Sequence, residues 1–256
     1  MIDTGLDTEA ITLITGAQQG IGEAITRRFS AAGARCALND LEATTRLVDL
    51  AKETNSVVAP ADISNRAFVH DMVEQLIDSH GPIGTLVCNA AYMTMAPFLD
   101  HDVEDWWKVV NTNLTGAFNL VQEVLPSMRS LGAGRIVIVS SYWGVTGWPD
   151  ATAYAASKAG LVSFIKTLGR ELAPEGIIVN GIAPGVISTP QLEVDARDAG
   201  VSVAEIEAQY ATAIPAQRVG QPSEIAEGVA FLCDRRIGSM VGTILQVNGG
   251  EVRGRV

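Results

Sequence analysis

The sequence T-G-A-Q-Q-G-I-G at positions 15–22 decides the fold of this chain. It follows a short apolar run at 10–15 and leads into a segment whose apolar residues recur with the spacing of a helix. Glycines at 16, 20 and 22 allow a tight turn, and they let backbone N–H groups and the helix N-terminus approach a pyrophosphate closely. Such a turn also occurs as plain packing, so the loop by itself leaves nucleotide binding open.

Outward from this loop, short β-rich apolar runs alternate with longer segments of helical period. This alternation predicts βαβ units around a parallel sheet. We expect one α/β domain over residues 1–256, with a Rossmann-type, doubly wound sheet of seven parallel strands and helices on both faces. The expected strands are 10–15, 35–39, 56–61, 84–89, 135–140, 177–182 and 243–247, with long helices at 103–129 and 153–172.

One connection is much longer than the others. It runs from 188 to about 220 and has a helical pattern near 203–212, set among Gly, Pro, Asp and Gln residues. A long excursion from the carboxyl end of a strand is where α/β folds place lids and substrate loops. We therefore expect a substrate loop here, with a decorative insertion as the alternative.

Composition limits the possible partners. The 256 residues are 47% hydrophobic and 18% charged, which suits a large core, and 18 basic against 29 acidic residues give a net charge of −11. An acidic surface repels nucleic acid and anionic membranes, so neither is an expected partner. No apolar run of about 18 residues and no apolar stretch at the N-terminus occur, so a cytoplasmic protein is expected.

The cysteines and histidines do not have the spacing of a metal site. Three cysteines lie far apart, two of them inside apolar runs, and the three histidines have no CxxC or HExxH companions. The cysteines are therefore interpreted as small core residues, and no metal is expected.

An acidic residue strengthens the case for a dinucleotide. Asp40 ends the second expected strand 18 residues after Gly22, where its carboxylate can accept hydrogen bonds from the adenosine ribose. The same carboxylate would repel a 2′-phosphate, and Gln18, Gln19 and Leu41 supply no positive charge to hold one. The pattern favours NAD over NADP. The alternative is that Asp40 only caps a turn.

A second motif, Y-A-A-S-K at 154–158, indicates acid/base chemistry. Its spacing places Tyr154 and Lys158 on the same face of a helix. We expect the ammonium to stabilise the phenolate and to draw the phenol pKa toward neutrality, as proton transfer requires. Ser141 follows the expected strand 135–140, where its hydroxyl could hold the substrate oxygen, although an isolated serine is more often a turn residue.

Taken together, these motifs resemble the classical short-chain dehydrogenase/reductase family over residues 10–250. The matching pieces occur in the family's order: the loop at 15–22, Asp62, N-A-A at 89–91, Asn113 in N-T-N-L-T-G, Ser141, Tyr154 with Lys158, and P-G-V-I-S-T-P at 184–190. One piece departs from the pattern, because the chain has C-N-A-A at 88–91 where the family usually has N-N-A-G. Ala91 adds a methyl group beside the expected cofactor path.

The resemblance implies a catalytic set of Asn113, Ser141, Tyr154 and Lys158, in which the asparagine helps to hold a water that leads from the lysine toward solvent. It also implies a homo-oligomer, usually a tetramer, built through the helices 103–129 and 153–172. The residues that would hold the cofactor are Gly16, Gln18, Gln19, Gly20, Ile21, Gly22, Asp40, Leu41, Asp62, Ile63, Asn89, Ala90, Ala91, Tyr154, Lys158, Pro184, Gly185, Val186, Ile187 and Thr189.

The expected activity is NAD-dependent, reversible hydride transfer between a secondary alcohol and its ketone. A polyol, a sugar or a cyclic or aromatic alcohol is the first substrate expectation. The preference for NAD favours oxidation of a secondary alcohol, polyol or sugar, and the aromatic and thioether side chains of the candidate pocket favour an apolar or ring-shaped substrate. The substrate contacts are expected from Ser141, Trp143, Trp148 and Tyr154, with Tyr92, Met93, Met95, Tyr142 and the 188–220 loop around them. The alternatives are a 3-oxoacyl-thioester reductase, which a preference for NADPH would support, a lyase or epimerase that retains its NAD, and an NAD-sensing module without turnover.

Overall fold

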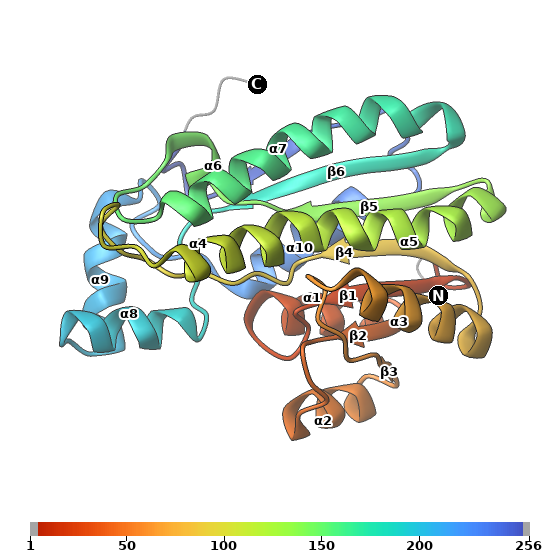
Figure 1. The fold of residues 1–256 in the computed structure, drawn as a ribbon, viewed down its shortest axis with the longest axis horizontal. Helices are drawn as coiled ribbons and strands as arrows, with labels where there is room; N and C mark the ends of the chain where they lie inside the picture. The colour runs from red at the N-terminus through yellow and green to blue at the C-terminus, as the bar shows by residue number, and fades with distance from the viewer. Residues whose placement is uncertain (1–4, 253–256) are drawn as a thin grey trace.

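A single sheet of seven parallel strands forms the centre of the molecule, in the order β3-β2-β1-β4-β5-β6-β7 (Figure 1). The computed structural model describes residues 5–252. The strands are β1 (Ile11–Thr15), β2 (Arg35–Asn39), β3 (Val57–Val58), β4 (Ile83–Cys88), β5 (Gly134–Val139), β6 (Ile177–Pro184) and β7 (Ile244–Val247). The expected single Rossmann-type α/β domain is thereby confirmed.

The strand order determines where a site can form. From β1 the chain moves outward to β2 and β3, then returns to place β4 on the other side of β1. The connections after β1 and β4 therefore leave in opposite directions at the carboxyl edge of the sheet. This switch point is where ligands bind in open parallel sheets.

Helices cover both faces of the sheet. The face formed with α1, α2 and α10 and the face formed with α3, α5 and α7 each have their own apolar core. The helices are α1 (Gly20–Ala31), α2 (Thr45–Glu53), α3 (Arg66–His80), α4 (Val103–Val110), α5 (Gly116–Leu131), α6 (Trp143–Thr146), α7 (Thr152–Leu172), α8 (Gln191–Ala199), α9 (Val203–Ala213) and α10 (Pro222–Cys233). A π-turn (Asn111–Thr115) and a 3-10 turn (Ala173–Glu175) complete the set.

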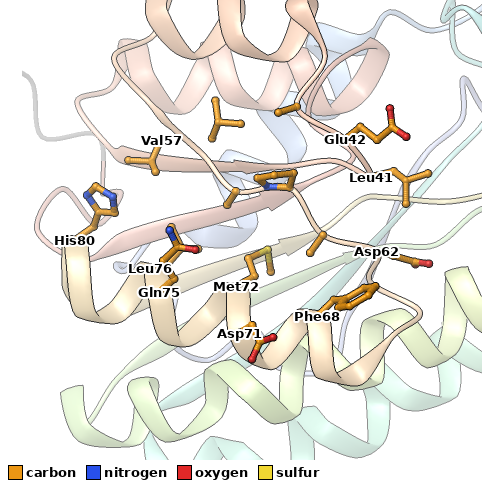
Figure 2. Close-up of a pocket in the computed structure, with 15 residues that line it drawn as sticks. Leu41, Glu42, Val57, Asp62, Phe68, Asp71, Met72, Gln75, Leu76 and His80 are labelled. Atoms are coloured by element: carbon orange, nitrogen blue, oxygen red, sulfur yellow. The ribbon is translucent and has the colours of Figure 1, made fainter.

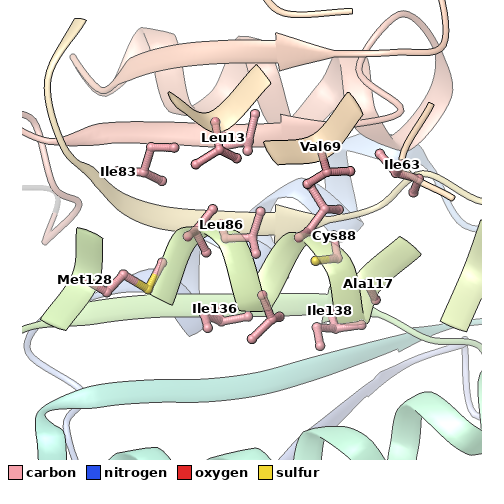
Figure 3. Packing of buried hydrophobic residues seen from close by; sticks show 14 of the residues in the cluster. Leu13, Ile63, Val69, Ile83, Leu86, Cys88, Ala117, Met128, Ile136 and Ile138 are labelled. Atoms are coloured by element: carbon pink, nitrogen blue, oxygen red, sulfur yellow. The ribbon is translucent and has the colours of Figure 1, made fainter. Parts of the chain in front are cut away.

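The central strands are buried on both faces, which explains why they are continuous apolar runs in the sequence. Figure 3 shows Leu86 and Ile136 from neighbouring strands packed under Val69 of α3 and Met128 of α5. All four side chains are fully buried. Burial of each such side chain contributes about 1.5–3 kcal/mol, so this layer fixes α3 and α5 against β4 and β5.

Three expectations about the elements were wrong in detail. The expected strand 56–61 is a regular strand only at Val57–Val58, although the N–H groups of Ala59 and Ala61 still donate to the carbonyl oxygens of Leu38 and Asp40. The expected helix 103–129 is divided by the π-turn into α4 and α5. The 188–220 excursion contains two helices, of which only α9 was expected. Within residues 5–252, no helix is long and apolar enough to cross a membrane.

Candidate active site

The glycine loop between β1 and α1 has the backbone conformation that its sequence predicts. Gly16 and Gly20 have φ angles of +62° and +55°, which side chains rarely adopt. A Cβ on Gly22 would lie 2.0 Å from the carbonyl oxygen of Gly16, so this glycine allows the turn to pack on itself. Gly22 therefore serves the shape of the loop rather than the lining of a cavity.

The N-terminus of α1 is left without a side-chain cap. Gln19 is its N-cap residue, and its side chain accepts no bond from the first turn. By contrast, Thr44, Asn65 and Asp102 cap α2, α3 and α4 with side-chain oxygens. Uncapped N–H groups and the positive end of a helix dipole bind an anion, so this helix end fits the pyrophosphate of a dinucleotide.

Asn89 braces the loop against the neighbouring strand. Its side-chain Nδ2 donates to the carbonyl oxygens of Thr15, at 2.9 Å, and Gly16, at 3.1 Å. Its backbone N–H donates to the hydroxyl of Thr15 at 3.0 Å. Asn89 was expected as a cofactor contact, and in the structure its side chain also joins β4 to the glycine loop.

A groove of about 590 Å³ extends from this loop to the end of β2. Its walls come from the carboxyl ends of β1, β2 and β4, as the switch point requires. The expected cofactor residues that line it are Gly16, Gln18, Gln19, Gly20, Ile21, Asp40, Leu41, Asp62, Ile63, Asn89, Ala90, Ala91 and Thr189.

A smaller cavity of about 220 Å³ continues from this groove, since Ile21, Asn89, Ala91 and Thr189 line both. Ala91, the departure from the family pattern, thus lies at the junction of the two spaces. The expected residues that line the smaller cavity also include Ser141, Trp143, Tyr154, Lys158, Pro184, Gly185, Val186 and Ile187. The structure therefore brings the expected nicotinamide contacts and three of the four expected catalytic residues together.

Lys158 is held beneath this cavity by α7. Its side chain is 2% exposed, and its Nζ donates to the carbonyl oxygen of Val139 at 2.8 Å. The ammonium lies 5.4 Å from the ring centroid of Tyr154, one turn earlier on the helix. Burial lowers the pKa of Lys158 from its usual 10.5 to about 8.

The expected lowering of the Tyr154 pKa is wrong for this structure. Loss of water around the phenol raises its pKa to about 12, and a hydrogen bond with Ser141 opposes this rise only in part. Removal of water disfavours the charged form of a phenol. The phenol is consequently a protonated group, ready to donate.

Ser141 lies directly after β5 and is 7% exposed. Its Oγ accepts a hydrogen bond from the backbone N–H of Trp143 at 3.2 Å. The same hydroxyl hydrogen-bonds the phenol of Tyr154, so the two groups converge on one point of the cavity, where both could reach a substrate oxygen. The arrangement suits a group that holds a carbonyl oxygen while its charge develops.

Asn113 lies behind the cavity and lines neither space. Its Nδ2 donates to the carbonyl oxygen of Tyr92 and to Oγ of Ser157, both at 3.0 Å, and its Oδ1 accepts from the N–H of Tyr92 at 2.8 Å. The hydroxyl of Ser157 in turn donates to the carbonyl oxygen of Tyr154 at 2.7 Å. Asn113 therefore ties the π-turn to the loop after β4 and to α7.

Ser157 was missed from the sequence. A serine one residue before Lys158 has no distinctive spacing, and only the π-turn, a feature often found at functional sites, brings Asn113 against it.

Aromatic rings form one wall of the cavity. Trp143 and Trp148 stack with centroids 5.1 Å apart and planes 8° apart, and Trp143 meets Tyr154 edge-on at 5.7 Å. Trp148 thus backs the wall without lining the cavity itself. Of the other expected pocket residues, Tyr142 and Met93 line the cavity, Tyr92 lines the groove, and Met95 lines neither space.

The 188–220 excursion closes the other side. The residues of this excursion that line the cavity are Thr189, Gln191, Leu192, Asp195 and Tyr210. The Tyr210 hydroxyl donates to Oδ2 of Asp195 at 3.1 Å, which joins α9 to α8. The Ser188 hydroxyl donates to Oε1 of Glu207 at 2.6 Å and so fixes α9 to the segment that follows β6.

A larger hollow of about 910 Å³ lies away from these residues, between the edge strand β3 and α3 (Figure 2). Met72, Gln75 and Phe68 of α3 form one wall, and Leu41 and Asp62 connect the hollow with the end of the groove. None of the four expected catalytic residues lines it. Among residues 5–252, no group of three or more His, Cys, Asp or Glu side chains is arranged to hold a metal ion.

Comparison with known proteins agrees with the fold and with the geometry of the site. A family model described as enoyl-(acyl carrier protein) reductase matches residues 16–251. The chain is 36% identical over 250 residues to 3-oxoacyl-(acyl-carrier-protein) reductase of Thermotoga maritima, covering 94% of this chain and 97% of the relative. It is 37% identical over 251 residues to oxidoreductase UcpA of Salmonella typhimurium, covering 95% of each.

A third relative, acetoacetyl-CoA reductase of Rhizobium meliloti, is 34% identical over 241 residues, covering 94% of this chain and 98% of the relative. These likenesses span the glycine loop, the groove and the cavity alike. The chain belongs to the classical short-chain dehydrogenase/reductase family and is an oxidoreductase built to use a nicotinamide cofactor.

Proposed function

We propose that this protein reduces the 3-oxo group of an acyl thioester with NADH, and catalyses the reverse oxidation. The observation that carries the proposal is the cavity in which Ser141, Tyr154 and Lys158 meet at the inner end of the groove. The substrate class follows the relatives, two of which are named as reductases of 3-oxoacyl or acetoacetyl thioesters. The family thus favours the thioester over our first expectation of a polyol or cyclic alcohol.

The residues divide the chemistry between them. A bound nicotinamide supplies the hydride for the carbonyl carbon. Ser141 holds the carbonyl oxygen, and Tyr154, whose raised pKa keeps it protonated, donates its proton to that oxygen. Lys158 lies next to the phenol and stabilises the phenolate that remains. Asn113 acts through position, because it locks the π-turn against α7.

The preference for NADH rests on the end of the groove. Asp40 lines it there, beside Gln18 and Leu41, and its carboxylate suits a ribose hydroxyl and opposes a 2′-phosphate. Gly16 and Gly20 permit the close approach of the pyrophosphate, which the uncapped α1 would bind.

A secondary alcohol or ketone with an apolar ring is the second candidate. The stacked pair of Trp143 and Trp148 favours it, because a flat indole wall suits a ring. The cavity lining also includes the carboxylate of Asp195 and no arginine, which suits an uncharged substrate.

A panel of ketones tests both candidates. Purified protein is mixed with NADH or NADPH and with acetoacetyl-CoA, a cyclic ketone or a ketose, and loss of nicotinamide absorbance is followed. We expect the highest kcat/KM with NADH and acetoacetyl-CoA. Turnover of the cyclic ketone alone would establish the second candidate, and no turnover despite cofactor binding would support the sensing module.

We also propose a homo-oligomer, assembled through α4 and α5. Val103 and Trp107 of α4 and Phe118 of α5 are large apolar side chains that are 68%, 53% and 41% exposed. Burial of this surface between copies would remove it from water. We expect Trp107→Glu to lower the oligomer mass measured by light scattering, and an unchanged mass would refute this interface.

A further inference from the structure

The side chain of Gln18 contacts Asp40, the acidic residue that lines the end of the groove. The backbone N–H of Gln18 donates to Oδ2 of Asp40, and its Nε2 donates to Oδ1, both at 3.2 Å. The backbone N–H of Leu41 adds a third bond, to Oδ1, at 2.9 Å. One glutamine thus contacts both oxygens of the carboxylate.

These bonds limit what Asp40 can still accept. A carboxylate offers about four acceptor positions, two on each oxygen. Oδ1 has two donors and Oδ2 has one. One acceptor position therefore remains, on Oδ2, and it is open to one further hydroxyl donor.

Gln18 is itself fixed by α2. The hydroxyl of Thr44 donates to Oε1 of Gln18 at 2.8 Å and accepts from the N–H of Leu47 at 3.2 Å, as the N-cap of α2. The bond from Thr44 turns the amide so that its NH₂ faces Asp40. A chain of hydrogen bonds thereby runs from the start of α2 through Gln18 to the carboxylate.

Two cations carried by α1 and α2 have other partners. Arg46, two residues after Thr44, lies 2.9 Å from Oε2 of Glu23, and Arg27 lies 3.0 Å from Oε1 of the same side chain. These contacts hold both guanidinium groups at Glu23 on α1. Neither guanidinium group is therefore placed beside Asp40 to attract a 2′-phosphate.

We propose that Gln18 is the positioning residue that sets cofactor choice: it holds the Asp40 carboxylate so that one oxygen receives a single ribose hydroxyl and its charge excludes a 2′-phosphate. The inference rests on the proposed preference for NAD(H) and assigns the Gln18 side chain a role beyond lining the groove. Gln18 acts only through Asp40, and this makes the proposal testable by a double-mutant cycle.

Calorimetry of the full chain with NAD⁺ and NADP⁺ measures the effect without any substrate. Gln18→Leu keeps the bulk of the side chain and removes its donor and acceptor. We expect NAD⁺ to bind about 10-fold more weakly and the affinity for NADP⁺ to change less than twofold. The ratio of the affinity for NAD⁺ to that for NADP⁺ should therefore fall about 10-fold. In kinetic assays, KM for NADH should rise while kcat stays within twofold.

Two further variants separate positioning from a general loss of structure. In an Asp40→Ala background, Gln18→Leu should have no further effect on the affinity for NAD⁺. Gln19→Leu is the matched control, because this neighbouring glutamine is exposed and its side chain caps nothing. It should shift the affinities for both cofactors by the same factor and leave their ratio unchanged.

The proposal would be overturned if Gln18→Leu bound NAD⁺ as tightly as the wild-type protein or more tightly. It would also be overturned if Gln18→Leu lowered the affinity for NAD⁺ by the same factor in the Asp40→Ala background. Equal affinities of the wild-type protein for NAD⁺ and NADP⁺ would overturn both the inference and the preference on which it rests. Failure to reduce any 3-oxoacyl thioester would instead refute the substrate proposal alone, since cofactor binding is measured separately.

Discussion

The two halves of the site are built in different ways. The proposed cofactor half is built from short connections after β1, β2 and β4, which supply glycine backbone, an uncapped helix end and one carboxylate. The substrate half uses the aromatic segment after β5 and the long excursion that carries α8 and α9. The comparison indicates that the proposed cofactor half follows from local geometry, while the proposed substrate half depends on side chains that only tertiary packing brings together.

The largest expected effect comes from removal of the proposed proton donor, which lines the cavity and not the groove. Tyr154→Phe deletes the proton donor and keeps the ring that packs edge-on against Trp143. General acid catalysis contributes about 10²–10⁴-fold, so we expect kcat for ketone reduction to fall about 10³-fold while the Kd for NADH changes less than threefold. Reduction at even a tenth of the wild-type rate would mean that another residue donates the proton.

Removal of the Lys158 ammonium should lower the activity and raise the stability of the folded protein. Its folded pKa, about 8, lies below its usual value of 10.5, so below pH 8 the folded protein bears the cost of a buried ammonium. Between about pH 8 and 10.5 the unfolded chain binds more protons than the folded one, and stability should rise with pH.

We therefore expect Lys158→Met to raise the free energy of unfolding at pH 7 by about 2 kcal/mol and to abolish the rise in stability between pH 7 and 9.5. Its kcat should fall about 100-fold, because the phenolate loses its electrostatic partner. Urea denaturation without cofactor at both pH values measures the first effect. A variant that is less stable at pH 7 would show that the bond to Val139 outweighs the cost of burial.

The smallest expected effect is confined to the substrate half. Ser188→Ala removes the 2.6 Å bond to Glu207 that fixes α9 beside the cavity. Because this bond orders the excursion and does not touch the glycine loop, KM for the ketone should rise about three- to tenfold with KM for NADH unchanged. Steady-state kinetics with each substrate varied in turn checks this. Equal changes in both KM values would indicate that the two halves are coupled.

The same division explains how much could be predicted from the sequence. The glycine loop, Asp40 and the pair of Tyr154 and Lys158 are specified by spacing within one strand-turn-helix unit or one helix, so their placement follows from local rules. The π-turn at Asn113 and its contact with Ser157 depend on α7, 44 positions later, and no periodicity reports them. The direction of the Tyr154 pKa shift also escaped prediction, since it depends on burial by the folded chain.

The substrate loop shows this limit as well. Helix α8 has two buried residues, Leu192 and Ala196, and no side-chain cap marks its start, whereas α9 begins with a capping box of Ser202 and Glu205.

Transfer of deuterium tests the central claim most directly. Protein, NADH carrying two deuterium atoms at C4 of the nicotinamide, and acetoacetyl-CoA are incubated together, and the product is analysed by mass spectrometry. We predict that each product molecule carries one deuterium on the carbon of the new hydroxyl group, and that Tyr154→Phe forms product of the same labelling far more slowly. A product without deuterium, or one formed equally fast without NADH, would contradict the assignment of hydride transfer to this cavity.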